Sequence, residues 1–183
     1  MAFIGPDLAG EGFLLDDFSS PDQTSEIGTA WEGFTDRVMG GKSDMSAGVV
    51  PAEGRNALRM RGNVSLENNG GFIQVRLPLG SSGKPFDAGR YTGIAVTART
   101  EAEIGDGYYI HLRTPRTVFP WAYYAAPLPV SGDWQRIEVP FSAFQSEFMV
   151  KNKLNKNKLL SVAIVAAKKQ FSADIYVSRV EFY

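Results

Sequence analysis

The feature that most constrains the fold of this chain is a period-two alternation of apolar and polar residues in short segments, each bounded by turn-forming residues. The 19 glycines and 10 prolines are scattered every few positions, and beyond residue 30 no stretch keeps a helical apolar period for three turns. The sequence therefore predicts half-buried strands and helices that are at most short, such as one turn within 141–148. The predicted strands are 72–77, 93–99, 108–113, 121–126, 134–140, 161–167 and 175–182.

Seven or more short strands at this spacing predict an all-β fold, with two antiparallel sheets packed as a sandwich or one sheet closed as a barrel. No repeat or linker divides the 183 residues, so we expect one domain over 1–183. Residues 1–17 are expected to form an acidic amino-terminal segment that packs on the domain or extends from it. Hydrophobic residues make up 44% of the chain, which excludes a disordered protein. The longest apolar run, 162–167, is too short to span a bilayer, so we expect no membrane-spanning segment.

The composition removes much of the usual chemistry of enzymes. The chain has no cysteine and a single histidine, His111, which excludes thiolate chemistry and multi-histidine metal centres. His111 lies in a predicted strand among Tyr and Arg, and no Gly-x-Ser-x-Gly motif supplies it with a nucleophile. Asp16, Asp17 and Glu181 offer oxygen ligands for Ca²⁺, but they lack the spacing of a calcium loop. We therefore expect no catalysis, no metal and no cofactor.

Strand parity gives each predicted strand one apolar and one polar face. In the first predicted strand Ile73, Val75 and Leu77 face one way, and Gln74 and Arg76 face the other. If the strands share one sheet, their polar faces form a basic surface flanked by aromatic rings, which would suit a carboxylate or phosphate. The alternative is that these are separate solvent-facing side chains on two sheets. The residues of this predicted surface are Gln74, Arg76, Arg99, Tyr109, His111, Arg113 and Arg136.

Charge is distributed unevenly, although the net charge is only −1. The first 36 residues hold eight acids and no Lys or Arg, and six of the eight lysines lie between Lys151 and Lys169. We interpret the lysine-rich run 151–158 as a solvated loop, with a binding element as the alternative. An acidic amino-terminal segment lying over a basic surface of the same domain is a further alternative. The low net charge gives no reason to expect a nucleic-acid partner.

Three glycine-rich motifs stand out from this background. The first, 31–43, places Met39 before a double glycine, and its Asp36 can accept hydrogen bonds from nearby backbone amides. The second, 65–72, contains Asn-Asn-Gly-Gly, which is typical of a tight turn that leads into a strand. The third, 105–109, is another hairpin-type entry to a strand. Taken singly, each motif is an ordinary turn.

Together and in this order, the motifs resemble the CIA30 family, named for complex I intermediate-associated protein 30. The family elements are Asn-Asp-x-Val-Met-Gly-Gly-x-Ser, Glu-Asn-Asn-Gly-Gly-Phe-x-x-x-Arg, Gly-Asp-Gly followed shortly by Tyr, and a Trp followed by an apolar strand that ends in Pro-Phe-x-x-Phe. The resemblance covers about 18–183, and Thr35 stands where the family usually has Asn. The matching residues are Trp31, Asp36, Val38, Met39, Gly40, Gly41, Ser43, Glu67, Asn68, Asn69, Gly70, Gly71, Phe72, Arg76, Gly105, Asp106, Gly107, Tyr109, Trp134, Pro140, Phe141 and Phe144.

The resemblance implies a galactose-binding-like jelly roll and a non-enzymatic role as a protein-binding assembly factor or chaperone for respiratory complex I, the NADH:ubiquinone oxidoreductase. The expected partners are therefore complex I subunits or assembly intermediates. The alternative is a module like the carbohydrate-binding modules, in which aromatic side chains such as Trp121, Tyr123 and Tyr109 stack on a sugar ligand. Mitochondrial members carry a targeting presequence that this chain lacks, so we expect a bacterial, cytoplasmic homologue, with a peripheral place at the inner membrane through its partners as the alternative.

The candidate binding residues come from the glycine-rich motifs, the polar strand face and one exposed aromatic. They are Asp36, Met39, Gly40, Gly41, Ser43, Asn68, Asn69, Gln74, Arg76, Tyr109, His111, Arg113 and Trp121.

Overall fold

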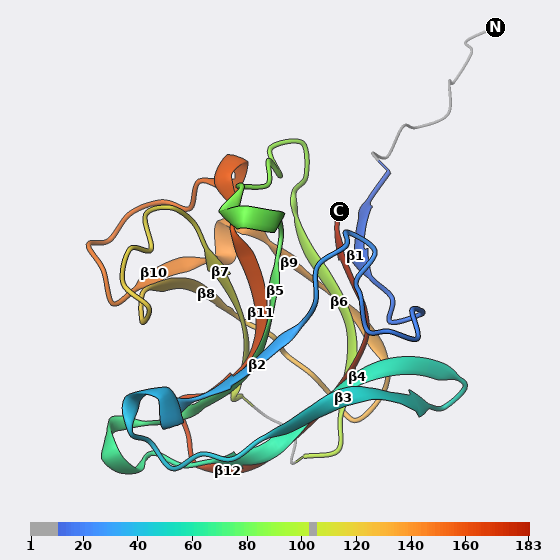
Figure 1. The fold of residues 1–183 in the computed structure, drawn as a ribbon, viewed down its shortest axis with the longest axis vertical. Coiled ribbons are helices and arrows are strands. Elements are labelled where there is room, and N and C mark those ends of the chain that lie inside the picture. Colours follow the sequence, from blue (N-terminus) through green and yellow to red (C-terminus); the bar gives the residue numbers. More distant parts are fainter. Residues whose placement is uncertain (1–10, 103–105) are drawn as a thin grey trace, which may run out of the picture.

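The chain forms a jelly-roll sandwich of two antiparallel sheets, as the sequence and the family resemblance predict (Figure 1). The computed structural model describes residues 11–102 and 106–183. Residues 1–10 of the acidic segment and Gly105 of the third motif lie outside the described residues. All seven predicted strands are present, with ends that differ from the prediction by a few residues. No described helix is long and apolar enough to span a bilayer.

Sheet 1 has six strands in the order β3-β4-β12-β6-β9, with β1 paired to β12. Its central strand, β12, pairs with β4 along its first half and with β1 near its end, where Phe182 lies opposite Phe13. The bounds are β1 (Phe13–Asp16), β3 (Ser46–Ala52), β4 (Arg55–Val64), β6 (Gly93–Thr100), β9 (Gln135–Pro140) and β12 (Phe171–Phe182).

Sheet 2 also has six strands, in the order β10-β8-β7-β11-β5-β2. Strand β11 lies in its middle, where Ile164 pairs with Val75 of β5 on one side and with Ile110 of β7 on the other. The bounds are β2 (Glu32–Thr35), β5 (Phe72–Pro78), β7 (Tyr108–Arg113), β8 (Tyr123–Pro127), β10 (Gln145–Glu147) and β11 (Ser161–Ala167).

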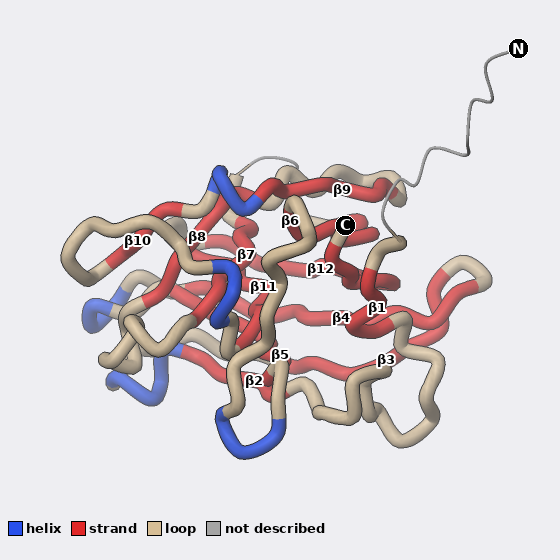
Figure 2. Tube along the Cα trace, turned by 90° about the horizontal axis from the view of Figure 1, so that it is seen from above, coloured by secondary structure: helices blue, strands red, loops and turns tan. Residues whose placement is uncertain are grey.

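The only helices among the described residues are five short 3-10 turns, seen as isolated blue segments in Figure 2. They are η1 (Asp36–Met39), η2 (Glu67–Asn69), η3 (Ser81–Gly83), η4 (Phe141–Ala143) and η5 (Lys156–Lys158). The turn predicted within 141–148 is present as η4, but the same segment continues into β10.

The core lies between the two sheets and is made by the apolar faces that strand parity predicts. Ile73, Val75 and Leu77 of β5 are at most 2% exposed. The facing sheet contributes Ile94 and Val96 of β6, which are fully buried. Such alternation lets each strand bury one face while the other remains available for contacts on the outside of the sandwich.

The loops at the two ends of sheet 2 differ in character. At one end, which we call the η1 end, β2 leads into η1, and η2 comes just before β5. At the other, the η5 end, segment 114–122 joins β7 to β8, and segment 148–155 follows β10. Figure 1 shows η1 and η2 at the lower left and the gold and orange segments of the η5 end at the upper left.

Candidate binding site

The first two glycine-rich motifs form a pair of loops, 36–43 and 65–71, which we call the signature loops. They are held together by Asp36, whose side chain is fully buried. Its carboxylate accepts hydrogen bonds from the backbone N of Ser43 at 2.9 Å and of Gly71 at 2.6 Å. It also accepts from the Ser43 hydroxyl at 2.5 Å and from the backbone N of Phe72 at 3.4 Å. One carboxylate therefore joins two loops that are distant in sequence.

These donors determine the ionisation of Asp36. Burial favours the neutral acid, but the hydrogen bonds from Ser43, Gly71 and Phe72 together hold the pKa of Asp36 below its ordinary value. Asp36 is therefore an anion bound by the surrounding backbone, an arrangement suited to a structural clamp rather than to proton transfer.

The glycines of the motifs make room for this carboxylate. A Cβ atom at Gly41 or at Gly70 would come closer than 3.0 Å to the Asp36 side chain, so neither position accepts a larger residue without a shift. Gly40 has φ 85° and Gly71 has φ 131°, conformations that glycine adopts at low cost. Gly70 itself has φ −78°, so its requirement for glycine comes from close approach to Asp36 and not from a left-handed backbone.

Further contacts tighten the signature loops. Asn68 and Asn69 both have left-handed backbones, which asparagine tolerates better than most residues, and Asn68 donates to the Gly40 carbonyl at 3.3 Å. The Ser43 hydroxyl accepts a hydrogen bond from Ser65 N at 2.9 Å. Six of the predicted binding residues therefore build the loops: Asp36, Gly40, Gly41, Ser43, Asn68 and Asn69.

The clamp leaves three apolar side chains at the surface, and we call them the signature patch: Val38, Met39 and Leu66. Val38 is 73% exposed and Met39 is 52% exposed. Leu66 is exposed on the second loop. Met39 was among the predicted binding residues, whereas Val38 and Leu66 were not, because a motif shows which residues recur and not which of them face solvent.

The outer face of sheet 2 brings together five residues of the predicted polar surface. Gln74 and Arg76 project from β5, and Tyr109, His111 and Arg113 project from β7. Strand β11 lies between these strands, and its small outward residues form the floor. Arg76 pairs with Glu32 at 3.2 Å and lies over the ring of Phe34 at 4.5 Å.

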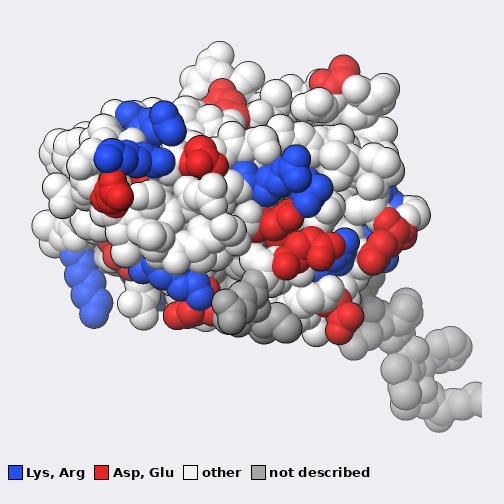
Figure 3. Space-filling model, turned by 90° about the horizontal axis from the view of Figure 1, so that it is seen from below, with Lys and Arg blue, Asp and Glu red and all other residues white. Residues whose placement is uncertain are grey.

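Arg99 and Arg136 do not belong to that surface, so this part of the prediction is wrong. They lie on β6 and β9 of sheet 1, where Arg99 pairs with Glu101 at 2.7 Å and Arg136 with Glu181 at 3.0 Å. Strand parity identifies which face a residue takes but not which sheet its strand joins. On the side of the molecule below β3 and β4, Figure 3 shows basic and acidic side chains next to one another instead of a continuous basic surface.

His111 is enclosed on the outer face of sheet 2. Its ring stacks on Tyr123 with centroids 3.8 Å apart, and within the described residues its Nε2 has no hydrogen-bond partner. An ion pair of 3.0 Å between Lys168, which follows β11, and Glu147 of β10 crosses over the intervening β7 and β8. Burial, with a smaller contribution from Lys168, lowers the pKa of His111 to about 3. The imidazole is therefore neutral at physiological pH.

Arg113 serves a loop at the η5 end. Its guanidinium donates to the carbonyls of Thr117 at 2.8 Å, Phe119 at 3.0 Å and Pro120 at 3.1 Å. Arg113 therefore holds the curve of segment 114–122, and these bonds occupy its donors. Trp121 lies in the same segment, where it is exposed and stacks on Phe119 with centroids 5.0 Å apart.

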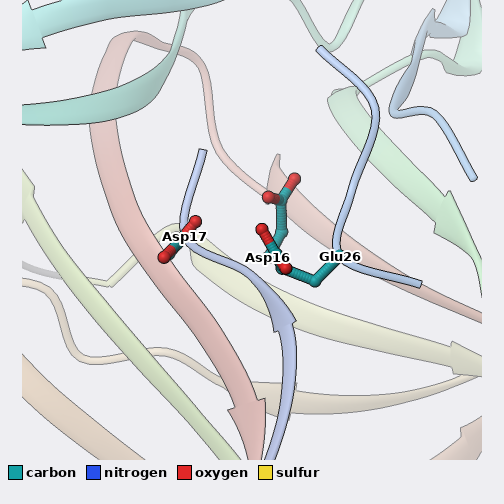
Figure 4. Close-up of side chains that lie close together, drawn as sticks. All are labelled: Asp16, Asp17 and Glu26. Carbon is teal, nitrogen blue, oxygen red and sulfur yellow. The ribbon is translucent and has the colours of Figure 1, made fainter. Parts of the chain in front are cut away.

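A cluster of acids lies where β1 ends (Figure 4). Carboxylate oxygens of Asp16, Asp17 and Glu26 lie within 4.8 Å of one another. Asp16 accepts hydrogen bonds from Phe18 N at 2.9 Å and from the Trp31 indole at 2.8 Å, while burial raises its pKa. Both bonds give Asp16 a role in fixing the start of the sandwich. Glu181, which sequence analysis had grouped with Asp16 and Asp17, is instead paired with arginines of sheet 1.

The hydrogen bonds of Asp36 explain why the first two motifs contain these residues. A comparison with known families identifies the family to which the motifs belong. The model of the family "Complex I intermediate-associated protein 30 (CIA30)" matches residues 17–174. The chain belongs to the CIA30 family. A comparison with curated protein sequences finds no match.

Solved structures similar to this CIA30 domain include carbohydrate-binding modules. The family 11 module of Clostridium thermocellum in complex with a β-1,3-1,4-mixed-linked tetrasaccharide has a TM-score of 0.71 at 16% identity, and the alignment covers 95% of this chain and 96% of that one. The family 30 module of a Clostridium thermocellum cellulase has a TM-score of 0.62 at 13% identity, over 85% of this chain and 91% of that one. At these identities the similarity establishes the jelly-roll fold.

Proposed function

We propose that this CIA30 domain is a non-enzymatic assembly factor for respiratory complex I, and that it binds a protein partner through the signature patch. The observation that carries the proposal is the exposure of Val38, Met39 and Leu66 on loops that a buried carboxylate holds in place. The family description supplies the association with complex I intermediates.

The construction of the loops favours binding. Loops fixed in advance lose little conformational entropy when a partner binds, so more of the apolar contact energy is retained as affinity. Methionine adapts its shape to a partner surface, and exposed Val and Leu add apolar area. The ion pair of Lys42 with Glu67 at 2.8 Å lies on the same two loops and supplies a polar edge of the kind that surrounds protein interfaces.

The test is affinity purification of the full chain from its native cell, followed by mass spectrometry for complex I subunits. Val38→Asp combined with Met39→Asp places two charges in the signature patch and should reduce recovery of complex I subunits at least tenfold. Asn56→Asp combined with Gln135→Asp is the matched control, because it adds the same charge at exposed positions near the start of β4 and of β9 in sheet 1, outside the signature patch and the η5 end.

The melting temperatures of all three proteins should agree within a few degrees, since the altered side chains are exposed. Recovery of complex I subunits by the double variant at the wild-type level would reject the signature patch. Absence of complex I subunits from the wild-type sample would reject the assembly role itself.

Sugar binding is a second candidate, which the aromatic side chains on the outer face of sheet 2 favour. Tyr109 and Tyr123 flank His111 there, and one of the similar carbohydrate-binding modules was solved with a tetrasaccharide. Aromatic rings offer flat apolar faces for a sugar, and Gln74 lies close enough to add a polar contact. A glycan array separates the two candidates: retention that Tyr109→Ala abolishes and Met39→Asp leaves intact would replace the protein partner with a sugar.

A further inference from the structure

A second set of exposed apolar side chains lies at the η5 end, away from the signature patch. Val118, Phe119 and Trp121 come from segment 114–122, and Phe148 and Val150 come from the segment after β10. Val150 is 87% exposed and Phe148 is 67% exposed. The two segments leave the sheet side by side, because Tyr123 of β8 pairs with Glu147 of β10.

Contacts within the fold hold both segments in place. Arg113 binds three carbonyls of the first segment, as described above. In the second segment, the Tyr124 hydroxyl donates to the Asn152 side chain, and Asn152 N donates to the Ser146 hydroxyl at 3.2 Å. The Asn152 amide also donates to the Val150 carbonyl at 2.6 Å. The apolar side chains are therefore displayed by anchored loops rather than by loose ones.

The two segments that carry these apolar side chains, with the lysine run that follows, have charge of a single sign. Of the acids beside them, Glu147 is paired with Lys168 at 3.0 Å and Asp87 accepts a hydrogen bond from Asn157 at 2.8 Å. Segments 114–122 and 148–158 contain no Asp or Glu, and together they hold five basic residues. Lys156 donates to the Tyr91 carbonyl at 2.7 Å, and the other four are exposed. Within residues 11–102 and 106–183, none of these four lies within ion-pair distance of a carboxylate, in contrast to the arginines of sheet 1. The four are Arg116, Lys151, Lys153 and Lys158.

We propose that the η5 end docks on the surface of an anionic lipid bilayer. In this arrangement Phe119, Trp121, Phe148 and Val150 enter the interface between headgroups and acyl chains, while Lys151 and Lys153 contact lipid phosphates. The surface is separate from the signature patch, which lies at the opposite end of sheet 2 and remains free for a protein partner.

The chemistry of this end favours a bilayer over a protein. Exposed Trp and Phe flanked by Lys are characteristic of elements that lie in the membrane interface, where the indole sits at headgroup level. Lysine is depleted from protein interfaces, whereas anionic lipid attracts each lysine near its surface. The lysine run that sequence analysis interpreted as a solvated loop thus gains a role from the apolar side chains that the fold brings beside it.

The experiment is co-sedimentation of the full chain with sucrose-loaded vesicles of phosphatidylcholine, with and without about 30% phosphatidylserine. We expect binding to the anionic vesicles that is at least tenfold stronger than binding to neutral ones. Lys151→Gln with Lys153→Gln should weaken binding to anionic vesicles tenfold or more, because each lysine contributes about fivefold. Trp121→Gln with Val150→Gln should weaken it to a similar extent.

Two control variants carry the same kinds of double substitution at the η1 end of sheet 2. Lys42→Gln with Lys169→Gln removes the same charge, and Val38→Gln with Met39→Gln removes exposed apolar side chains. Both should bind vesicles as the wild type does.

Three results would overturn the proposal. They are a wild-type chain that stays in solution with both vesicle types, equal binding to anionic and neutral vesicles, and unchanged binding by the η5-end variants. The comparison of vesicle types uses the wild-type chain alone, so it holds even if a variant fails to fold. Loss of complex I subunits from the signature-patch variants is a separate readout, so the two proposals fail independently.

Discussion

The carboxylate of Asp36 and the backbone N of Gly71 are 2.6 Å apart, although 35 residues separate them in the chain. This hydrogen bond joins η1 to the start of β5. The backbone N and the hydroxyl of Ser43 donate two further hydrogen bonds to the same carboxylate. The motifs that characterise the CIA30 family in this chain are therefore two halves of one structural unit. That unit fixes the loops on which Val38, Met39 and Leu66 are exposed.

Asp36→Asn should destabilise the domain by about 1 to 3 kcal/mol, because an amide nitrogen would face backbone donors that the carboxylate now accepts from. The measurement is the free energy of unfolding in urea at pH 7. Asp133→Asn is the matched control at an exposed position and should change that free energy by less than about 0.5 kcal/mol. Equal stability of the two variants would show that the clamp contributes nothing to the fold.

The same carboxylate should make the domain sensitive to acid. The pKa of Asp36 is lowered in the folded state, so the unfolded chain binds a proton first as the pH falls. Its contribution to stability is complete above the unfolded pKa of about 3.9 and is lost as the pH falls through the lower folded pKa. Urea unfolding followed from pH 6 to pH 2.5 should show a steeper decline for the wild type than for Asp36→Asn. Parallel curves would contradict the assignment.

Gly41→Ala and Gly70→Ala should each destabilise the domain by about 1 to 3 kcal/mol, since the new methyl group would meet the Asp36 carboxylate. Gly48→Ala in β3 is the control, because a Cβ atom there has no neighbour within 4 Å, and alanine should be neutral or stabilising. Thermal melts of the three variants provide the comparison. If all three melt alike, close approach to Asp36 does not explain the glycines.

Much of the fold could be predicted from local pattern. Strands 108–113 and 161–167 were predicted with the observed bounds. The first shows a clear alternation of apolar and polar residues, the second is a continuous apolar run, and turn residues flank both. Strand β4 was not predicted, although Leu58 and Met60 alternate with arginines, because Gly62 and Asn63 interrupt the pattern before Val64. The short strands β1, β2 and β10 have three or four residues each, too few to show a period.

The site was less predictable than the fold because it depends on contacts between distant segments. Nothing in the sequence around Asp36 shows that Gly71 is one of its hydrogen-bond partners. The motif would look the same whether Asp36 joined two loops or contacted a ligand. Likewise, Arg76 and Arg99 have similar surroundings in sequence, and only the strand pairing places them on different sheets. The ion pair of Lys168 with Glu147 also forms only once β10 and β11 are in the same sheet.

His111→Phe should stabilise the domain, and more at pH 5 than at pH 8. The pKa of His111 falls to about 3 in the folded state from an ordinary value of 6.5, so between these values only the unfolded chain gains the proton. Wild-type stability should therefore decline as the pH falls below about 6.5, by at most about 1.4 kcal/mol per pH unit from this residue. Phenylalanine keeps the stack on Tyr123 and removes both the proton and the unpaired Nε2.

Chemical unfolding of the wild type and His111→Phe at the two pH values measures the effect. Tyr109→Phe, which changes a neighbour of His111 on the same face and leaves His111 in place, is the control and should keep the wild-type pH dependence. A difference between His111→Phe and the wild type that stays constant with pH would mean that His111 titrates normally.

Arg113→Lys should loosen segment 114–122 although it preserves the charge. The guanidinium binds the carbonyls of Thr117, Phe119 and Pro120 at once, and a lysine ammonium cannot reproduce that planar fork. Amide hydrogen exchange measures the change at Thr117 and Ala122, whose N–H groups are bonded within the segment. Their protection should fall at least tenfold, while the amides of β11 keep theirs. The alternative is that Arg113 serves an acidic partner through its charge alone. Arg113→Lys would then leave these amides protected and preserve partner binding, and Arg113→Gln would weaken partner binding without changing the protection of these amides.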